Sequence, residues 1–303
     1  MRKKLGLMNT GPRNLCVVAL ALSFTSPPAP AAGRLPDIRT LAPDLDPPPM
    51  TEESPAAGRR VRRTTPGWED TGVYHALYLP VDWKPGARFP VLVEFQGNGG
   101  YSNDNGDHCD GMIESCRLGF GIFGGAGYLW ICMPFVDVID SWKENCPLWW
   151  GDPDETAAYC LATVREVCRE YGGDEHAVVL CGFSRGSIAC NYIGLRNETI
   201  APLWRAFICH SHYDGVRTRW PYADADRDSA LARLQRLRGR PQFISHEISA
   251  DETRRYLAAT GVTGDFTIVD FPYRNHTDLW ALCDSGLRRE VRAWLRAHGL
   301  PAP

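Results

Sequence analysis

The chain has 303 residues, of which 44% are hydrophobic, and its formal net charge is −3 at pH 7. This size and apolar content suffice for one large core, and α/β domains of about 250 residues are common. The acidic charge argues against nucleic acid as a partner, and after the N-terminus no apolar stretch approaches the length of a membrane span.

The first 31 residues have the pattern of a secretory signal peptide. Basic side chains precede an apolar run at 15–22, and the small residues of Ala29-Pro30-Ala31 suit a cleavage site. We therefore expect a secreted or periplasmic protein with no membrane partner after cleavage. A retained membrane anchor is the alternative, although the run is short for a bilayer. Removing residues 1–31 would leave 29 basic and 36 acidic residues, a net charge of −7.

Residues 32–67 are rich in Pro, Ala, Arg and Glu and show no apolar periodicity. Such a composition is typical of a linker or of an extended arm that lies on a domain. The arginine cluster at 59–63 is accordingly expected on a solvated face. We expect the folded domain to span residues 68–303.

The rest of the chain alternates between strand-like and helix-like patterns. A helix is predicted from Asp154 to Gly172-Gly173, others at 229–237 and 252–260, and a last one carries apolar residues from Leu287 to Leu295. Strands are predicted at 73–80, 89–95, 129–135, 178–183, 206–209, 242–245 and 266–271. This alternation predicts an α/β fold with a mostly parallel, doubly wound sheet and helices on both faces.

Gly182-Phe183-Ser184-Arg185-Gly186 follows one of these strands and precedes residues that can continue as a helix. This is the G-x-S-x-G pattern of a nucleophile elbow, in which a serine occupies a strained strand-to-helix turn. Side chains at either glycine would collide with neighbouring backbone, and the new helix directs free N–H groups toward a reacting carbonyl oxygen. Ser184 is therefore the predicted nucleophile. The alternative is an ordinary turn with an incidental serine.

A nucleophilic serine needs a base, and the base needs an orienting acid. His276 follows the last predicted strand and is the candidate base. The candidate acid is Asp251, a few residues past the strand at 242–245, although Asp251 also suits a helix N-cap. Glu247 at the strand end and Asp214 after the preceding strand remain the alternatives.

Backbone N–H groups are needed to stabilise the negative oxygen of the intermediate. Arg185, which follows the serine, would supply one from its backbone. The glycine-rich segment 96–101 follows an early strand, and its Asn98 or Gly99 would supply the other.

Two further clusters suggest binding. Trp142, Trp149 and Trp150 lie in the loop before a long helix, where they could stack on a sugar or an aromatic acyl group, or simply pack on the sheet. The group His210, His212 and Asp214 resembles a metal-ligand set, but hydrogen bonding or lining of a pocket explains it better, so no metal is expected.

Ten of the eleven cysteines would remain after signal removal, and an oxidising compartment permits disulfides. Cys109 with Cys116, and Cys146 with a neighbour, lie in irregular segments where bridging is plausible. The cysteines on predicted strands are expected to be buried free thiols; they are Cys132, Cys181 and Cys209.

Taken together, residues from about Tyr74 to Gly299 resemble a secreted α/β-hydrolase of the polyhydroxybutyrate depolymerase and feruloyl esterase-like type. The motifs that carry this resemblance are the strand at 89–95 with Gln96-Gly97-Asn98-Gly99-Gly100, the Ser184 elbow and the terminal His276. Two features depart from it. Gln96-Gly97 stands where many relatives have His-Gly, and residues 246–251 replace the usual short Gly-x-x-Asp.

The resemblance implies hydrolysis of carboxylic esters through an acyl-enzyme, without a cofactor, on a small-molecule or polysaccharide-linked substrate. A serine peptidase of the prolyl-oligopeptidase type is the second hypothesis. A catalytically inactive homologue that binds carbohydrate through its tryptophans is the third. The sequence leaves the oligomeric state open.

Overall fold

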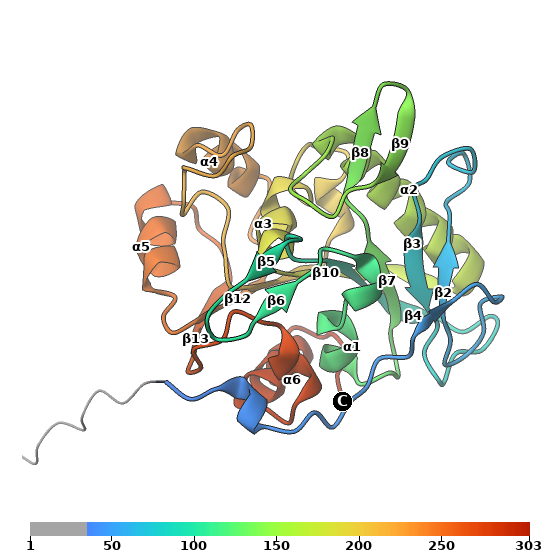
Figure 1. Cartoon of the computed structure of the whole chain (residues 1–303), viewed down its shortest axis with the longest axis horizontal. Coiled ribbons are helices and arrows are strands. Elements are labelled where there is room, and N and C mark those ends of the chain that lie inside the picture. Colours follow the sequence, from blue (N-terminus) through green and yellow to red (C-terminus); the bar gives the residue numbers. More distant parts are fainter. Residues whose placement is uncertain (1–34) are drawn as a thin grey trace, which may run out of the picture. The chain divides into compact units, whose positions relative to one another are not determined.

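A nine-stranded sheet runs through residues 35–303, the part of the chain that the computed structural model describes (Figure 1). Its strand order is β1-β2-β3-β7-β4-β10-β11-β12-β13. The strands from β7 onward in this order pair in parallel, whereas β3 is antiparallel to both β2 and β7. The predicted signal peptide lies outside the described residues.

Two small antiparallel hairpins, β5–β6 and β8–β9, stand apart from the main sheet. The strands are β1 (Met50–Thr51), β2 (Arg60–Arg63), β3 (His75–Tyr78), β4 (Phe89–Phe95), β5 (Tyr101–Ser102), β6 (His108–Cys109), β7 (Leu129–Met133), β8 (Val136–Ile139), β9 (Trp142–Asn145), β10 (Gly173–Phe183), β11 (Ala206–His210), β12 (Gln242–Glu247) and β13 (Phe266–Phe271). The helices are α1 (Leu118–Phe123), α2 (Pro153–Tyr171), α3 (Arg185–Tyr192), α4 (Arg227–Gln235), α5 (Asp251–Thr260) and α6 (Gly286–Ala297).

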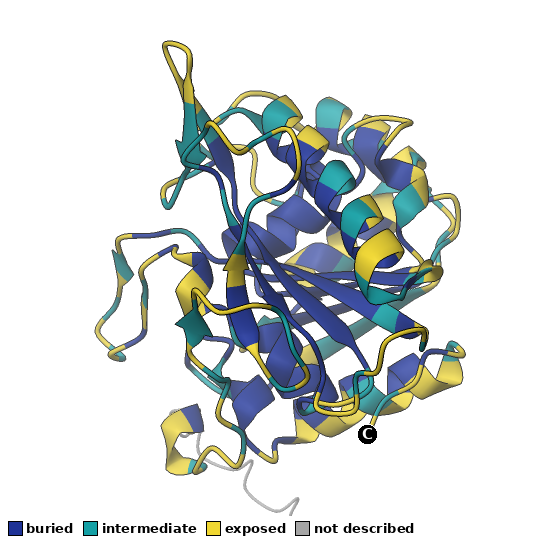
Figure 2. Ribbon diagram, turned by 90° about the vertical axis from the view of Figure 1, so that its right-hand side faces the viewer, coloured by how far each residue is buried: buried dark blue, intermediate teal, exposed yellow. Residues whose placement is uncertain are grey.

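Alternating side chains of the central strands enter two cores, one on each face of the sheet. In β10, Val178 and Leu180 belong to one core, and Val179 and Cys181 belong to the other. Helices α2, α3, α4 and α5 contribute to the first core, and α1 and α6 contribute to the second. Figure 2 shows the resulting layers, with buried strands between helices whose outer faces are exposed. The predicted α/β architecture is confirmed.

The predicted helices and strands of the C-terminal two thirds form with small shifts in their ends. Helix α2 begins at Pro153 because the side chain of Asp152, not of Asp154, accepts from two N–H groups of its first turn. It ends before Gly172, whose φ of 77° suits a glycine C-cap. Within residues 35–303 no helix is both long and apolar enough to cross a membrane.

The segment expected to be a linker or an extended arm belongs, from Leu35 onward, to the folded unit Leu35–Pro303. Its Arg60–Arg63 stretch forms strand β2, antiparallel to β3. Arg60 was expected in solvent but is only 3% exposed. Its guanidinium donates to the carbonyl oxygens of Ile113 and Glu114 and lies 4.7 Å from the ring centroid of Trp130. These acceptors, distant in sequence, compensate the cost of burial.

The expected disulfides do not form among the described residues. All ten cysteines from Cys109 to Cys283 are free thiols, so the structure contains neither of the bridges considered plausible, Cys109 with Cys116 and Cys146 with a neighbour. The cysteines predicted as buried thiols on the central strands are indeed buried; they are Cys132, Cys181 and Cys209.

The carboxylate of Glu94, on β4, caps the N-terminus of helix α1 by accepting hydrogen bonds from its first N–H groups. One oxygen accepts from the backbone N–H groups of Arg117 and Leu118 at 3.1 Å each. The other accepts from Gly119 N at 2.7 Å and from Trp130 Nε1 at 2.9 Å. Burial, with a smaller contribution from the charge of a neighbouring aspartate, raises the pKa of Glu94 to about 7 despite these donors. Above that pH the group is an ionised acceptor for four N–H groups.

Glu94→Gln is expected to lower the free energy of unfolding by about 3 kcal/mol at pH 8, because an amide NH₂ cannot accept from the two N–H groups that one oxygen serves. Urea denaturation at pH 8 measures the change. Glu175→Gln, at an exposed position of β10, is the matched control and should change stability by less than about 0.5 kcal/mol. Equal stabilities of the two variants would contradict the role of Glu94.

Candidate active site

Ser184 sits at the sharp turn between β10 and α3 with a φ of 55°, a region that non-glycine residues rarely adopt. The neighbouring backbones pack as the glycine spacing predicts. A Cβ at Gly182 would collide with the carbonyl of Gly186, and a Cβ at Gly186 would collide with the carbonyl oxygen of Phe95. The turn therefore depends on both glycines and holds the serine at the carboxyl ends of the parallel strands.

A chain of hydrogen bonds joins three side chains that come from separate strand ends. Ser184 Oγ lies 2.9 Å from His276 Nε2, and His276 Nδ1 lies 2.6 Å from Glu247 Oε1. Glu247 is the last residue of β12, and His276 lies in the loop after β13. All three are at most 9% exposed. The geometry is that of a nucleophile, a base and an orienting acid.

The carboxylate beside His276 is Glu247 and not Asp251, so the first choice of acid is wrong. Asp251 begins helix α5, its side chain is 62% exposed, and it pairs with Arg254 at 2.9 Å. Asp214 does not reach the histidine either, because it is buried in an ion pair with Arg233 at 2.8 Å. The sheet holds Glu247 at the strand end, whereas the chain turns away at the following residue, whose φ is 69°.

The surroundings of Glu247 favour its ionised form. Burial alone would raise the pKa of this carboxyl, but the hydrogen bond and charge of His276 outweigh it, with smaller contributions from His246 and His210. The net effect holds the pKa of Glu247 well below its usual value. The group is therefore a carboxylate at neutral pH, suited to accept the Nδ1–H of His276.

Two residues that the sequence analysis missed support this arrangement. The hydroxyl of Ser211 donates to Glu247 Oε1 at 3.1 Å and lies 2.9 Å from His276 Nδ1. Asp107, in the loop that carries β5 and β6, accepts from the backbone N–H of His276 and from the side chain of Asn275, both at 2.9 Å. These contacts join residues that are 36 to 169 positions apart, so no local pattern indicates them.

Two backbone N–H groups, of Arg185 at the elbow and of Asn98 in the glycine-rich loop, have no acceptor within residues 35–303 and could serve a negative oxygen. Arg185 is the first residue of α3, so its N–H lacks an acceptor within the helix. Gly99, one of the two candidates in the glycine-rich loop, donates its N–H to Pro147 O at 2.8 Å and is already engaged. Among the described residues nothing accepts from the N–H of Asn98.

The side chain of Arg185 fixes the loops around the serine. Its buried guanidinium donates to the carbonyl oxygens of Gly97 at 2.9 Å and of Trp149, and lies 3.9 Å from the ring centroid of Phe135. Burial lowers its pKa to about 9, so the group still carries charge at neutral pH. It links the glycine-rich loop and the tryptophan loop to the elbow.

A cavity of about 440 Å³ opens over Ser184 Oγ, and we call it the reaction cavity. Its lining includes aromatic side chains from three loops, and the rings of Trp149 and Trp220 lie 5.7 Å apart. Of the three tryptophans proposed to bind substrate, only Trp149 lines it. Its lining residues are Asn98, Gly99, Gly100, Tyr101, Trp149, Ser184, Arg185, Ile188, His212, Arg217, Trp220, Glu247 and His276.

The other two tryptophans lie outside the reaction cavity, which corrects the expectation that they contact substrate there. Trp150 is 3% exposed and packs on Tyr192 with ring centroids 4.5 Å apart. Trp142 lies on the β8–β9 hairpin, 49% exposed, and does not line the reaction cavity. Trp220 lines the reaction cavity instead, although it lies in an irregular loop where no sequence pattern indicates it.

Trp149→Ala is expected to lower kcat/KM for an ester with an aromatic or sugar group about tenfold, because the substrate loses a stacking surface. Trp142 on the hairpin offers a matched control: kcat/KM of Trp142→Ala should stay within about twofold of the wild-type value. Steady-state kinetics with both variants measures the difference. Equal losses would show that Trp149 does not contact the substrate.

The residues of the cluster that resembles a metal-ligand set, His210, His212 and Asp214, each make contacts with different partners. His210 is buried, with Ser245 Oγ at 2.8 Å and Thr277 O at 3.1 Å from its ring nitrogens. Asp214 is occupied by Arg233, while His212 lines the reaction cavity. Within residues 35–303 no group of three His, Cys, Asp or Glu side chains is placed to hold a metal ion.

No protein-family model and no curated protein matches the sequence. Solved structures match in fold. Native esterase 2 of Thermogutta terrifontis matches with a TM-score of 0.51 and 17% identity, over 80% of this chain and 93% of that chain. An acylaminoacyl peptidase of Pyrococcus horikoshii matches with a TM-score of 0.52 and 15% identity, over 81% of this chain and 42% of that chain. This chain spans 62% of the length of another match, a thermostable esterase. At these identities the likeness shows the α/β-hydrolase fold alone.

Proposed function

We propose that the protein is a serine hydrolase that cleaves carboxylic esters through an acyl-enzyme. The observation that carries this proposal is the hydrogen-bond chain from Ser184 through His276 to Glu247, set on an elbow with a positive φ. A serine hydroxyl is a weak nucleophile alone, and this arrangement supplies both the base and its orienting acid.

In the proposed reaction, Ser184 Oγ attacks the ester carbonyl carbon while His276 Nε2 takes its proton. Glu247 accepts the Nδ1–H, which fixes the ring orientation and stabilises the imidazolium. The N–H groups of Arg185 and Asn98 stabilise the oxygen that becomes negative. The imidazolium then protonates the leaving alkoxide, and the C–O bond breaks. Water, deprotonated by the same histidine, releases the acid and restores the serine.

We propose esters of carbohydrate-linked acyl groups or hydroxyalkanoates as the substrate class. Support comes from the reaction cavity, whose size suits a small acyl or sugar group and whose Trp149 and Trp220 offer aromatic surfaces. Secretion or periplasmic export also remains a proposal. Burial of eight of the ten described cysteines would limit their oxidation in such a compartment.

Turnover of 4-nitrophenyl acetate and butyrate by the purified protein tests the proposal. We expect hydrolysis by the wild type and a loss of at least about a thousandfold in His276→Ala, because the base is removed. Cleavage of blocked peptide amides with no ester preference would favour the peptidase hypothesis. Binding of carbohydrate without any ester turnover would favour the inactive homologue.

A further inference from the structure

Positively charged side chains continue from the reaction cavity across the loop after β11 to helix α5. The reaction cavity shares Arg217 with a second cavity of about 390 Å³. A third, of about 560 Å³, shares Arg217 and Arg255 with the second and adds Arg227. We call these three residues the arginine row. Arg217 lines all three cavities and is the member of the row that lines the reaction cavity together with Ser184.

The arginine row lacks the partners that hold other arginines of the chain. Arg254, for comparison, pairs with two aspartates at 2.8 and 2.9 Å. Within residues 35–303 no hydrogen bond or ion pair engages the side chains of Arg217, Arg227 or Arg255. Arg217 has one ring contact, 5.7 Å from the centroid of Trp220. An unpaired guanidinium presents a planar set of donors that matches a carboxylate.

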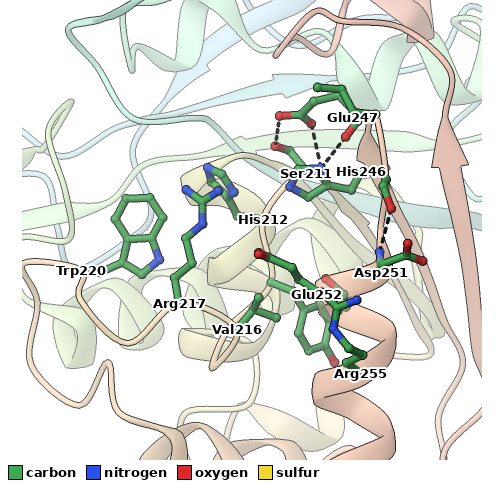
Figure 3. A pocket seen from close by; sticks show the side chains of 14 residues that line it. Ser211, His212, Val216, Arg217, Trp220, His246, Glu247, Asp251, Glu252 and Arg255 are labelled. Carbon is green, nitrogen blue, oxygen red and sulfur yellow. Dashed lines mark hydrogen bonds and ion pairs between the residues drawn. The ribbon is translucent and has the colours of Figure 1, made fainter. Parts of the chain in front are cut away.

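In Figure 3, the side chain of Arg217 extends between Trp220 and His212, which line the reaction cavity as well. Burial, followed by the nearby positive charge of His276, lowers the pKa of His212 to about 3, so its ring is neutral at pH 7. The carboxylate of Glu247, which also lines this cavity, is occupied by His276. Arg217 is thus the cation in the reaction cavity that is free to meet a ligand.

Acidic groups weaken the positive charge farther from the serine. Asp251 and Glu252 line the second cavity, and Asp228 lines the third. Asp251 is occupied by Arg254, but Glu252 points into the same space as Arg255. The attraction for an anion is therefore greatest at Arg217.

We propose that Arg217 binds a carboxylate carried by the ester substrate, so that anionic esters are preferred over neutral esters of the same shape. This inference rests on the proposed ester hydrolysis at Ser184. The chain as a whole is acidic, with a net charge of −3, and would otherwise repel such substrates. A charge-assisted, two-pronged contact with a guanidinium supplies the selectivity.

Two matched ester pairs test the inference. 4-Nitrophenyl hydrogen adipate against 4-nitrophenyl hexanoate places the carboxylate on the acyl side. 3-(4-Acetoxyphenyl)propanoate against 4-propylphenyl acetate places it on the alcohol side. The readout is the ratio of kcat/KM for the anionic ester to kcat/KM for its neutral partner. In at least one pair, Arg217→Met should lower this ratio about tenfold at low ionic strength.

Two further variants sharpen the result. Glu252→Gln removes the competing negative charge and should raise the same ratio. Arg88→Met is the matched control, because it also removes one positive charge. Arg88 is exposed, lies before β4 at the opposite end of the sheet, and its loss should leave the ratio unchanged. A ratio that stays within twofold of wild type in Arg217→Met, for both pairs, would overturn the inference. Absence of turnover on all four esters would instead count against the proposed function.

Discussion

Ser184→Ala is expected to reduce kcat/KM for ester hydrolysis by about ten-thousandfold or more, while the protein remains folded. In the proposed reaction the hydroxyl attacks the carbonyl carbon, and the remaining N–H groups and cavity cannot replace it. Initial rates on 4-nitrophenyl butyrate measure the loss, and circular dichroism and thermal unfolding verify the fold. Ser54→Ala, an exposed serine in the N-terminal segment, should keep wild-type activity.

Loss of activity in a folded Ser184→Ala variant distinguishes the elbow serine from every other nucleophile in the chain. Retention of more than about a tenth of the wild-type rate would mean that another group performs the chemistry. Nucleophilic catalysis at Ser184 would then be excluded.

Glu247→Gln is expected to lower kcat by about a thousand- to ten-thousandfold, and Asp251→Asn to leave it within about twofold. Of these two carboxylates, Glu247 contacts the ring of His276, at 2.6 Å, whereas Asp251 pairs with Arg254 on the surface. An amide at position 247 removes the charge that stabilises the imidazolium, and its NH₂ group favours the wrong ring tautomer. Steady-state kinetics of both variants on one ester gives the comparison.

Glu247→Gln is also expected to change how the free energy of unfolding depends on pH. Because the pKa of Glu247 is lowered in the folded protein from a usual value of 4.5, its charge contributes stability above that pH. The contribution is lost as the pH falls toward the folded pKa. The difference in unfolding free energy between wild type and Glu247→Gln should therefore shrink below about pH 4.5. A slow Asp251→Asn variant with a normal Glu247→Gln variant would reverse the assignment.

The sequence was sufficient for the parts of the site that local patterns determine. An apolar run followed by Gly-x-Ser-x-Gly predicts both the strand β10 and the turn, because only glycine tolerates backbone at that distance. The position of His276 follows from chain order, since the loop after the last parallel strand lies at the same sheet edge as the elbow. Strand β13 was predicted with the bounds that it has.

The rest depends on contacts that sequence spacing does not encode. Three carboxylates lie near the ends of neighbouring strands, and one turn with a φ of 69° at Ile248 decides that Glu247 faces the histidine. Arg60 was expected on a solvated face because the carbonyl groups and ring that accommodate it are at least 50 residues away. Trp220 enters the reaction cavity from a loop without any periodic pattern.

Organophosphorus reagents modify a serine only when a neighbouring base activates it. The most direct measurement is therefore treatment of the folded protein with a fluorophosphonate, followed by intact-mass analysis and peptide mapping. A single adduct on Ser184, absent from His276→Ala, is the result that our account predicts. No adduct, or one on another residue, would contradict it.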